Sequence, residues 1–144
     1  MVPTLAGRIQ TRIFTLVVVG SIWLLIITPA LPQDAPLNEM YQATFLVLGM
    51  VIVLGIGWEF VYHGLQQFRW EKDWPALFGL LTGINEGILV WVLLVWVMPD
   101  SLVKPNGASF VIAFGTVWLV VWMFVNGPMR VPFIHWRFRG GRII

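Results

Sequence analysis

The chain contains four apolar stretches, each near the length that an α-helix needs to cross the hydrocarbon core of a bilayer, about 20 residues. They run from about residue 13 to 31, 43 to 63, 76 to 98 and 108 to 125. Prolines at the ends of the first and third stretches, such as Pro29 and Pro75, are typical helix boundaries. Because the connectors are short, neighbouring helices are expected to run antiparallel. The sequence therefore predicts an all-α integral membrane protein, in which one four-transmembrane-helix up-down bundle forms the only domain.

Composition agrees with a membrane protein and excludes several kinds of chemistry. Of the 144 residues, 58% are hydrophobic and only 11% are charged, whereas soluble domains carry about a quarter charged residues. The chain has no cysteine, so disulfides, thiolate metal sites and thiol catalysis are excluded.

Lysine and arginine lie almost entirely on one side of the predicted bundle. Only Lys104 falls on the other side. The remaining basic residues flank the opposite ends of the helices: Arg8, Arg12, Arg69, Lys72, Arg130, Arg137, Arg139 and Arg142. Since positive charge near the ends of spans marks the cytoplasmic side, both termini are predicted to be cytoplasmic. The expected location is the plasma (inner) membrane of a bacterium.

Glu86 lies near the middle of the third apolar stretch, directly after Asn85. A carboxylate at this depth costs roughly 2.5–3.5 kcal/mol, so it needs a partner or a function. Gly79, Gly83 and Gly87 recur every four residues on the adjoining face of the helix. Glycines at this spacing let another helix approach closely. Glu86 is therefore predicted to point toward protein and away from lipid.

Glu59 and His63 lie four residues apart in the second stretch, with Gly55 near the same stripe. Judged by depth, His63, Glu59 and Glu86 form a possible ladder from the cytoplasmic surface into the membrane. Chains of this kind serve as proton relays in pumps and transporters. The candidates for proton or ion coupling are therefore Glu86, Glu59, His63 and Asn85.

Structural readings of the same residues stay open. Glu59 and His63 could bond to each other, and Glu86 could bond within the bundle or to an arginine or histidine of a partner protein. One imidazole and two carboxylates form an incomplete metal site, so no metal and no cofactor are expected. No serine has a nearby histidine, and no nucleotide-binding glycine motif is present. We therefore expect a protein that is not an enzyme and has no catalytic residues.

The segment 126–144 is a basic tail in which arginines alternate with aromatic residues. Rings at the membrane interface and guanidinium groups near anionic head groups are both favourable there. The residues expected to bind anionic lipids or an acidic partner are Arg130, Arg137, Arg139 and Arg142. Nucleic acid is not an expected partner.

Two functions are compatible with these features. The first is a non-catalytic accessory or scaffolding subunit of a larger plasma-membrane complex, or a homo-oligomer, packing through Gly55, Gly79, Gly83 and Gly87. Its partners are the lipid bilayer, anionic lipids and other membrane subunits or further copies of itself. The alternative is a component of a proton- or cation-coupled transporter or channel, which uses Glu86 together with Glu59 and His63.

Overall fold

Every regular element is helical in the computed structural model, which describes residues 2–144. The elements in chain order are α1 (Leu5–Thr15), the π-helical turn η1 (Leu16–Gly20), α2 (Ser21–Ile27), η2 (Thr28–Ala30), α3 (Leu37–Gln67), α4 (Ala76–Trp96), α5 (Gly107–Asn126), η3 (Pro128–Arg130) and α6 (Ile134–Phe138). Four helices are long and apolar enough to cross a membrane: Leu5–Ala30, Leu37–Gln67, Ala76–Trp96 and Gly107–Arg130. This confirms the prediction of an all-helical chain with the pattern of a multi-pass membrane protein.

The first helix begins earlier than its apolar stretch. Thr4 caps it, since its Oγ1 accepts a hydrogen bond of 3.1 Å from the backbone N–H of Gly7. The helix therefore starts at Leu5, whereas the hydropathy pattern predicted a start near residue 13. Arg8 and Arg12 consequently lie inside the helix and not before it. The sequence placed these two arginines before the first helix. They can lie within it because both are paired with acids inside the protein.

The other long helices have local start and stop signals as well. Pro36 precedes α3 and Pro75 precedes α4, and proline suits the entry to a helix because it has no N–H to leave unpaired. Asn106 caps α5 through its Oδ1, which accepts a 2.8 Å bond from the Ser109 N–H. Gly127 follows the end of α5. These signals explain why the helix ends follow the proline and glycine positions.

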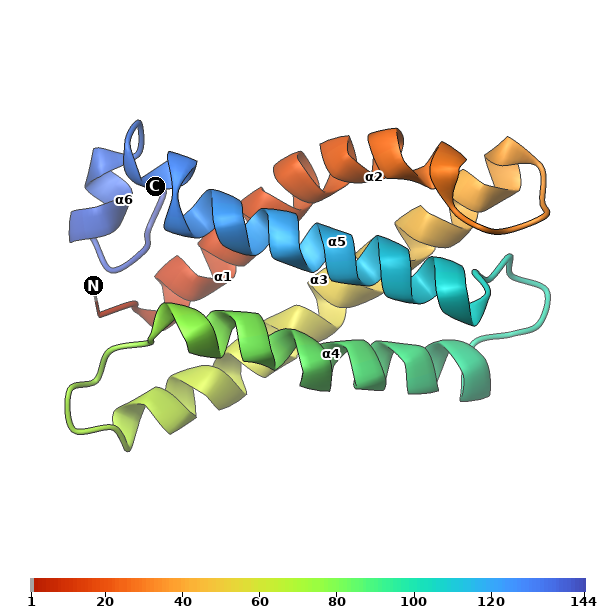
Figure 1. Cartoon of the computed structure of the whole chain (residues 1–144). Coiled ribbons are helices and arrows are strands. Elements are labelled where there is room, and N and C mark those ends of the chain that lie inside the picture. Colours follow the sequence, from red (N-terminus) through yellow and green to blue (C-terminus); the bar gives the residue numbers. More distant parts are fainter. Residues whose placement is uncertain (1) are drawn as a thin grey trace.

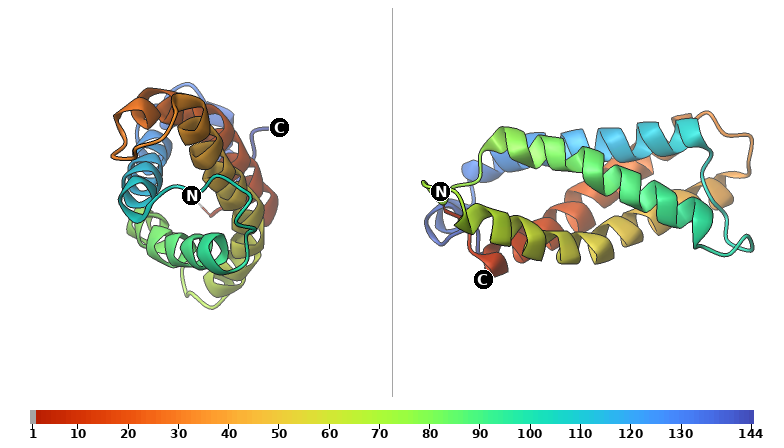
Figure 2. Two further views of the ribbon diagram at one scale, coloured as in Figure 1. Left: turned by 90° about the vertical axis from the view of Figure 1, so that its right-hand side faces the viewer. Right: turned by 90° about the horizontal axis from the view of Figure 1, so that it is seen from below.

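The four long helices run along the length of the molecule, with α3 and the α1–α2 segment inclined to α4 and α5 (Figure 1). The α1 segment packs against α3, α3 against α4, and α4 against α5, while α5 packs back against η1 and α2. Viewed end-on, they form a ring (Figure 2). Both termini, α6 and the α3–α4 connection lie at one end of the molecule, which we call the terminal end (Figure 1).

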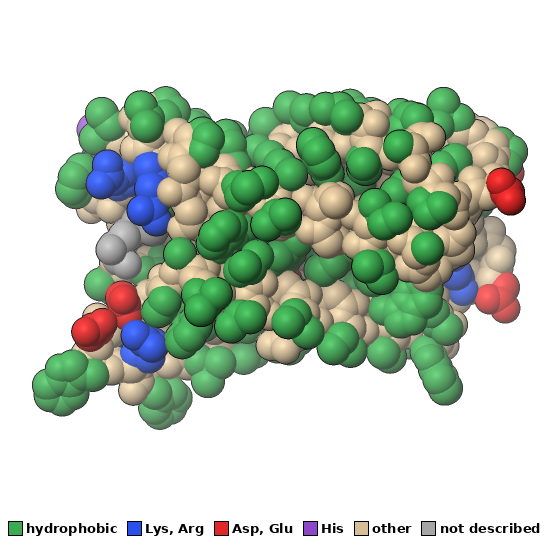
Figure 3. Space-filling view, in the orientation of Figure 1, with side chains coloured by type: hydrophobic (Ala, Val, Ile, Leu, Met, Phe, Trp, Pro, Cys, Tyr) green, Lys and Arg blue, Asp and Glu red, His purple; other side chains and the backbone are tan. Residues whose placement is uncertain are grey.

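The interior has an apolar part and a polar part. Leu16, Leu24, Val90, Leu94 and Phe110 belong to one continuous hydrophobic core. The outer surface is also apolar over most of the visible face, and its charged side chains gather at the two ends (Figure 3). Buried charges are found between the core and the terminal end, where they form the cluster described next.

Candidate functional site

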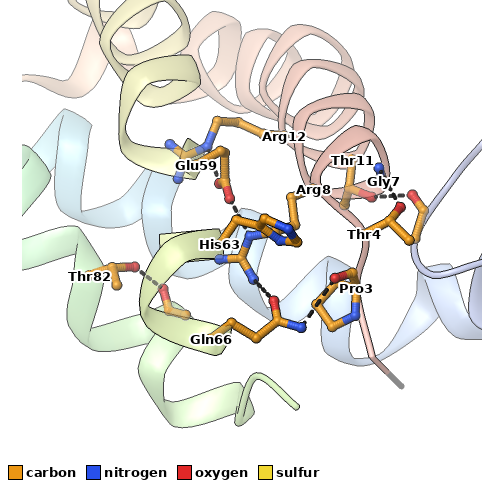
Figure 4. A network of polar contacts seen from close by, with 12 residues as sticks. Pro3, Thr4, Gly7, Arg8, Thr11, Arg12, Glu59, His63, Gln66 and Thr82 are labelled. Atoms are coloured by element: carbon orange, nitrogen blue, oxygen red, sulfur yellow. Dashed lines mark hydrogen bonds and ion pairs between the residues drawn. The ribbon is translucent and has the colours of Figure 1, made fainter. Parts of the chain in front are cut away.

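Four charged side chains from three helices, all almost entirely shielded from solvent, form one cluster. Arg8 and Arg12 come from α1, Glu59 from α3 and Glu86 from α4. None of these side chains is more than 9% exposed. Figure 4 shows Arg8 and Arg12 beside Glu59. Because the cluster holds two positive and two negative charges, it is electrically neutral.

Arg12 lies at the centre of the cluster. Its Nη1 and Nη2 donate to the two carboxylate oxygens of Glu86 at 2.6 and 2.8 Å, and its Nε donates to Oε1 of Glu59 at 2.6 Å. Arg8 donates from Nε to Oε2 of Glu59 at 2.7 Å. Every carboxylate oxygen in the cluster thus accepts a charge-assisted hydrogen bond, the strongest kind available to a side chain. The cluster ties α1 to both α3 and α4.

The absence of a side chain at Gly55 explains how Arg12 of α1 passes α3 and reaches α4. Gly55 lies one turn before Glu59 on α3, and a Cβ at this position would come within 2.8 Å of Cδ of Arg12. Without a Cβ, the arginine side chain can cross the surface of α3 and bind Glu86 on α4. The sequence predicted that Gly55 serves helix packing, and the structure places a charged side chain against it.

Gln66 extends the cluster toward the terminal end. Its Oε1 accepts a 3.3 Å bond from Nη1 of Arg8, and its Nε2 donates to the carbonyl oxygens of Pro3 and Lys72 at 3.2 and 2.6 Å. The guanidinium carbon of Arg8 also lies 4.6 Å from the centre of the Trp74 ring, a cation–π contact. These bonds hold the start of the chain and the α3–α4 connection against the cluster.

The structure joins only part of the predicted ladder. Glu59 and Glu86 meet through Arg12, but His63 makes no hydrogen bond with Glu59 among residues 2–144, and its Nε2 lies 3.5 Å from Nε2 of Gln67. The Nδ1 atom of His63 is buried and has no hydrogen-bond partner in the described part of the chain. Arg8 and Arg12, to which the sequence assigned only a role in membrane orientation, bind the two glutamates where the ladder predicted His63. The signal that could have revealed them is charge balance, since two cations on a neighbouring helix can neutralise two acids within spans.

The glycines of α4 pack against aromatic rings of α5 instead of against a helix backbone. Gly79 faces Trp122, Gly83 faces Trp118 and Gly87 faces Phe114. Each indole also donates to α4, because Trp118 Nε1 bonds to the Gly79 carbonyl at 3.2 Å and Trp122 Nε1 to the Ala76 carbonyl at 2.7 Å. The missing side chains on α4 therefore create the space that large rings on α5 fill.

The opposite side of α4 faces outward and is apolar. Its exposed residues recur every three or four positions: Leu77, Leu81, Ile84, Ile88, Val92 and Val95. Asn85 is exposed on this outer side, near the middle of the helix. Its side chain makes no hydrogen bond with any described residue of the chain. Asn85 therefore does not join Glu86, although the two are neighbours in sequence.

A cavity of about 260 Å³ adjoins the cluster and is bordered by α1, α3, α4, α5 and the C-terminal segment. Arg8, Arg12, Glu59 and Tyr62 form a polar part of its wall. Four tryptophans line its apolar part: Trp74, Trp118, Trp122 and Trp136. The cavity is thus polar against the cluster and aromatic elsewhere.

The basic tail is folded onto the first helix. The Gly140 carbonyl accepts a 2.8 Å bond from the Thr4 N–H, and Trp136 Nε1 donates to Thr11 Oγ1 at 2.7 Å. A Cβ at Gly7 would overlap the Gly140 carbonyl oxygen, so this contact requires glycine on the helix. The predicted lipid-binding arginines remain exposed at the terminal end: Arg130, Arg137, Arg139 and Arg142.

No protein-family model matches the chain, and searches of curated proteins and of solved structures also give no match. The cluster, the outer face of α4 and the cavity are the features of the molecule that bear on its function.

Proposed function

We propose that the chain is a multi-pass protein of a bacterial plasma membrane, folded as an up-down bundle with both termini in the cytoplasm. It works without catalysis, by assembling with other subunits in the bilayer. We propose that a second copy of the chain packs on the outer face of α4. The observation that carries this proposal is Asn85, an exposed amide in the middle of an apolar helix face that makes no hydrogen bond with residues 2–144.

A second copy suits Asn85 for a chemical reason. An amide in hydrocarbon without a partner loses the hydrogen bonds that water would supply. The asparagine side chain contains both a donor and an acceptor, so two copies can bond to each other across a twofold axis. The apolar residues around Asn85 have the three- and four-residue spacing of a helix-pairing seam. Polar side chains within such seams are known to hold membrane helices together.

The charged cluster favours a structural role over coupling. Both oxygens of Glu59 and both oxygens of Glu86 already accept bonds from arginine. Arg12 would have to leave before Glu86 could bind a proton or a cation. Since neither His63 nor Asn85 connects with the two glutamates, the coupled transporter remains the less supported alternative.

The absence of cysteine makes the assembly easy to test, because any introduced cysteine is the only one. Ile88→Cys places a thiol on the outer face of α4, and Val53→Cys places one on the exposed side of α3 as a matched control. After oxidation in native membranes, we expect a disulfide-linked dimer from Ile88→Cys and monomer from Val53→Cys.

Asn85 itself is tested in the Ile88→Cys background. Adding Asn85→Leu should reduce the dimer yield several-fold, since interhelical polar bonds contribute about 0.6–2 kcal/mol, and Asn85→Gln should retain much of it. Equal cross-linking at the two cysteine positions, or a dimer yield unaffected by Asn85→Leu, would refute the pairing. Cross-links from Ile88→Cys to a different protein would replace the homo-oligomer with the accessory subunit.

A further inference from the structure

We infer that the cavity beside the arginine–glutamate cluster is a binding site for a monoanionic amphiphile, meaning an oxyacid head group joined to an apolar chain. This inference does not depend on the proposed assembly, because the cavity and the outer face of α4 are different surfaces. It follows from the unpartnered polar groups, the charge and the aromatic lining of the cavity wall.

Tyr62 is the first indication of a ligand. The residue is only 3% exposed, it lines the cavity, and its hydroxyl has no hydrogen-bond partner among residues 2–144. A buried hydroxyl without a partner is uncommon in proteins and calls for an explanation. A polar group of a ligand in the cavity would supply the missing hydrogen bond.

The polar groups of the cavity wall that remain without a hydrogen bond are donors. An arginine has five N–H donors, and Arg8 uses Nε and Nη1 while its Nη2 makes no hydrogen bond within the described part of the chain. Both oxygens of Glu59 are already occupied by arginines. A cationic ligand would therefore find no free carboxylate, whereas a carboxylate or phosphate oxygen would find free N–H and O–H groups.

The charge of the wall points to one negative charge on the ligand. Arg8, Arg12 and Arg130 line the cavity together with a single acid, Glu59. Glu86 neutralises Arg12 from outside the lining. One positive charge remains, and a monoanion would balance it.

The aromatic lining accounts for the apolar part of the ligand. Trp118 and Trp122 are held in place by hydrogen bonds to α4, and Trp136 is held by its bond to Thr11. Because these rings are already fixed, an apolar chain that packs on them does not have to order them first. The lining includes Pro75, just before α4, and Asn126, at the end of α5, so the cavity lies where these two helices end and, in the proposed orientation, near the lipid head groups.

The test measures tryptophan fluorescence of the full chain, purified in dodecyl maltoside, during titration with two matched pairs of probes. Decanoate is paired with decanol, and dioctanoyl phosphatidylglycerol with dioctanoyl phosphatidylcholine. We expect saturable binding of an anionic probe, at least about tenfold tighter than its uncharged or zwitterionic counterpart. Binding of decanoate alone would identify a free fatty acid as the source, and binding of phosphatidylglycerol alone a membrane phospholipid.

Variants then locate the binding. Tyr62→Phe and Arg130→Gln should each weaken binding of the anionic probe by about 3–10-fold, the effect of losing one hydrogen bond. Arg137→Gln is the matched control, because Arg137 is also exposed but does not line the cavity, and it should leave binding unchanged. Arg130 is exposed, so its substitution tests the site even if Tyr62→Phe disturbs folding. Equal binding of decanol and decanoate, no saturable response to either anion, or identical affinities in all variants would overturn the inference.

Discussion

Arg12 bonds to the carboxylates of two different helices, and its own helix supplies neither of them. Removing it would leave Glu59 with only Arg8, and Glu86 with no arginine at all. An uncompensated buried charge is far more costly than a well-packed apolar replacement of the whole pair. The balance of charge in the cluster therefore matters more than the presence of any one member.

We expect Arg12→Met to lower the free energy of unfolding by about 3–5 kcal/mol. The double variant Arg12→Met, Glu86→Met should recover most of this loss, because the remaining pair, Arg8 and Glu59, is again neutral. Unfolding followed by far-UV circular dichroism in mixed micelles measures both values. A double variant as unstable as Arg12→Met alone would contradict the importance of charge balance.

Sequence reasoning found the acids of this cluster and missed its arginines. Glu59 and Glu86 attract attention because a carboxylate inside an apolar stretch has no ordinary explanation. Arg8 and Arg12 had such an explanation, since basic residues before a first span are expected on the cytoplasmic side. The pairing depends on how the helices are rotated about their axes, which hydropathy does not determine.

In the α4–α5 pair, the smallest residues of one helix face large aromatic residues of the other. Glycines on α4 face Trp118, Trp122 and Phe114 of α5, and neighbouring rings stack along α5 with centroids 5.7 Å apart for Phe114 and Trp118. A side chain added to α4 would occupy the volume of a ring, and tightly packed interiors tolerate such additions poorly. The fit is therefore sensitive to a single methyl group.

Gly83→Ala should destabilise the bundle by about 1–3 kcal/mol, because the new Cβ would collide with the Trp118 indole. Gly57→Ala is the matched control, since a Cβ there meets nothing within 4 Å. It should be neutral or stabilising by about 0.5–1 kcal/mol, through higher helix propensity. The same unfolding measurement applies to both variants, and equal effects would show that the ring packing is unimportant.

The number of long helices could be predicted from sequence, and so could the ends of α4 and α5 to within two residues, but the first two long helices begin several residues before their apolar stretches. Hydropathy marks the apolar part of a helix, whereas Thr4 and the cluster allow the first helix to start at Leu5, beyond that part. The glycine spacing on α4 was also visible in the sequence. Its partner was not, because the matching spacing of Phe114, Trp118 and Trp122 on α5 becomes meaningful only when the two helices are aligned.

Charge at the terminal end gives the molecule its proposed orientation. With Arg8 and Arg12 inside the bundle, the remaining basic residues of this end come from the α3–α4 connection and the tail, while Lys104 lies at the opposite end. The asymmetry still favours a cytoplasmic terminal end. The folded tail, which sequence alone did not predict because its docking depends on the contact of Gly7 with Gly140, keeps its arginines exposed there.

We expect Ser101→Cys, in the connection between α4 and α5, to react with a membrane-impermeant maleimide in intact cells. Glu71→Cys, in the connection between α3 and α4, should react only after the membrane is permeabilised. Both residues are exposed, so accessibility within the protein does not distinguish them. The reverse labelling pattern would invert the proposed orientation.

The order of synthesis determines when the ion pairs of the first helix can form. Glu59 follows Arg12 by 47 residues and Glu86 follows it by 74, so a ribosome completes the first helix long before it makes either acid. Until then the two arginines of α1 lack the carboxylates that they bind in the folded protein, and we expect their charge to hold the start of the helix at the membrane surface. The helix that is translated first can therefore reach its final depth only after α3 and α4 have arrived.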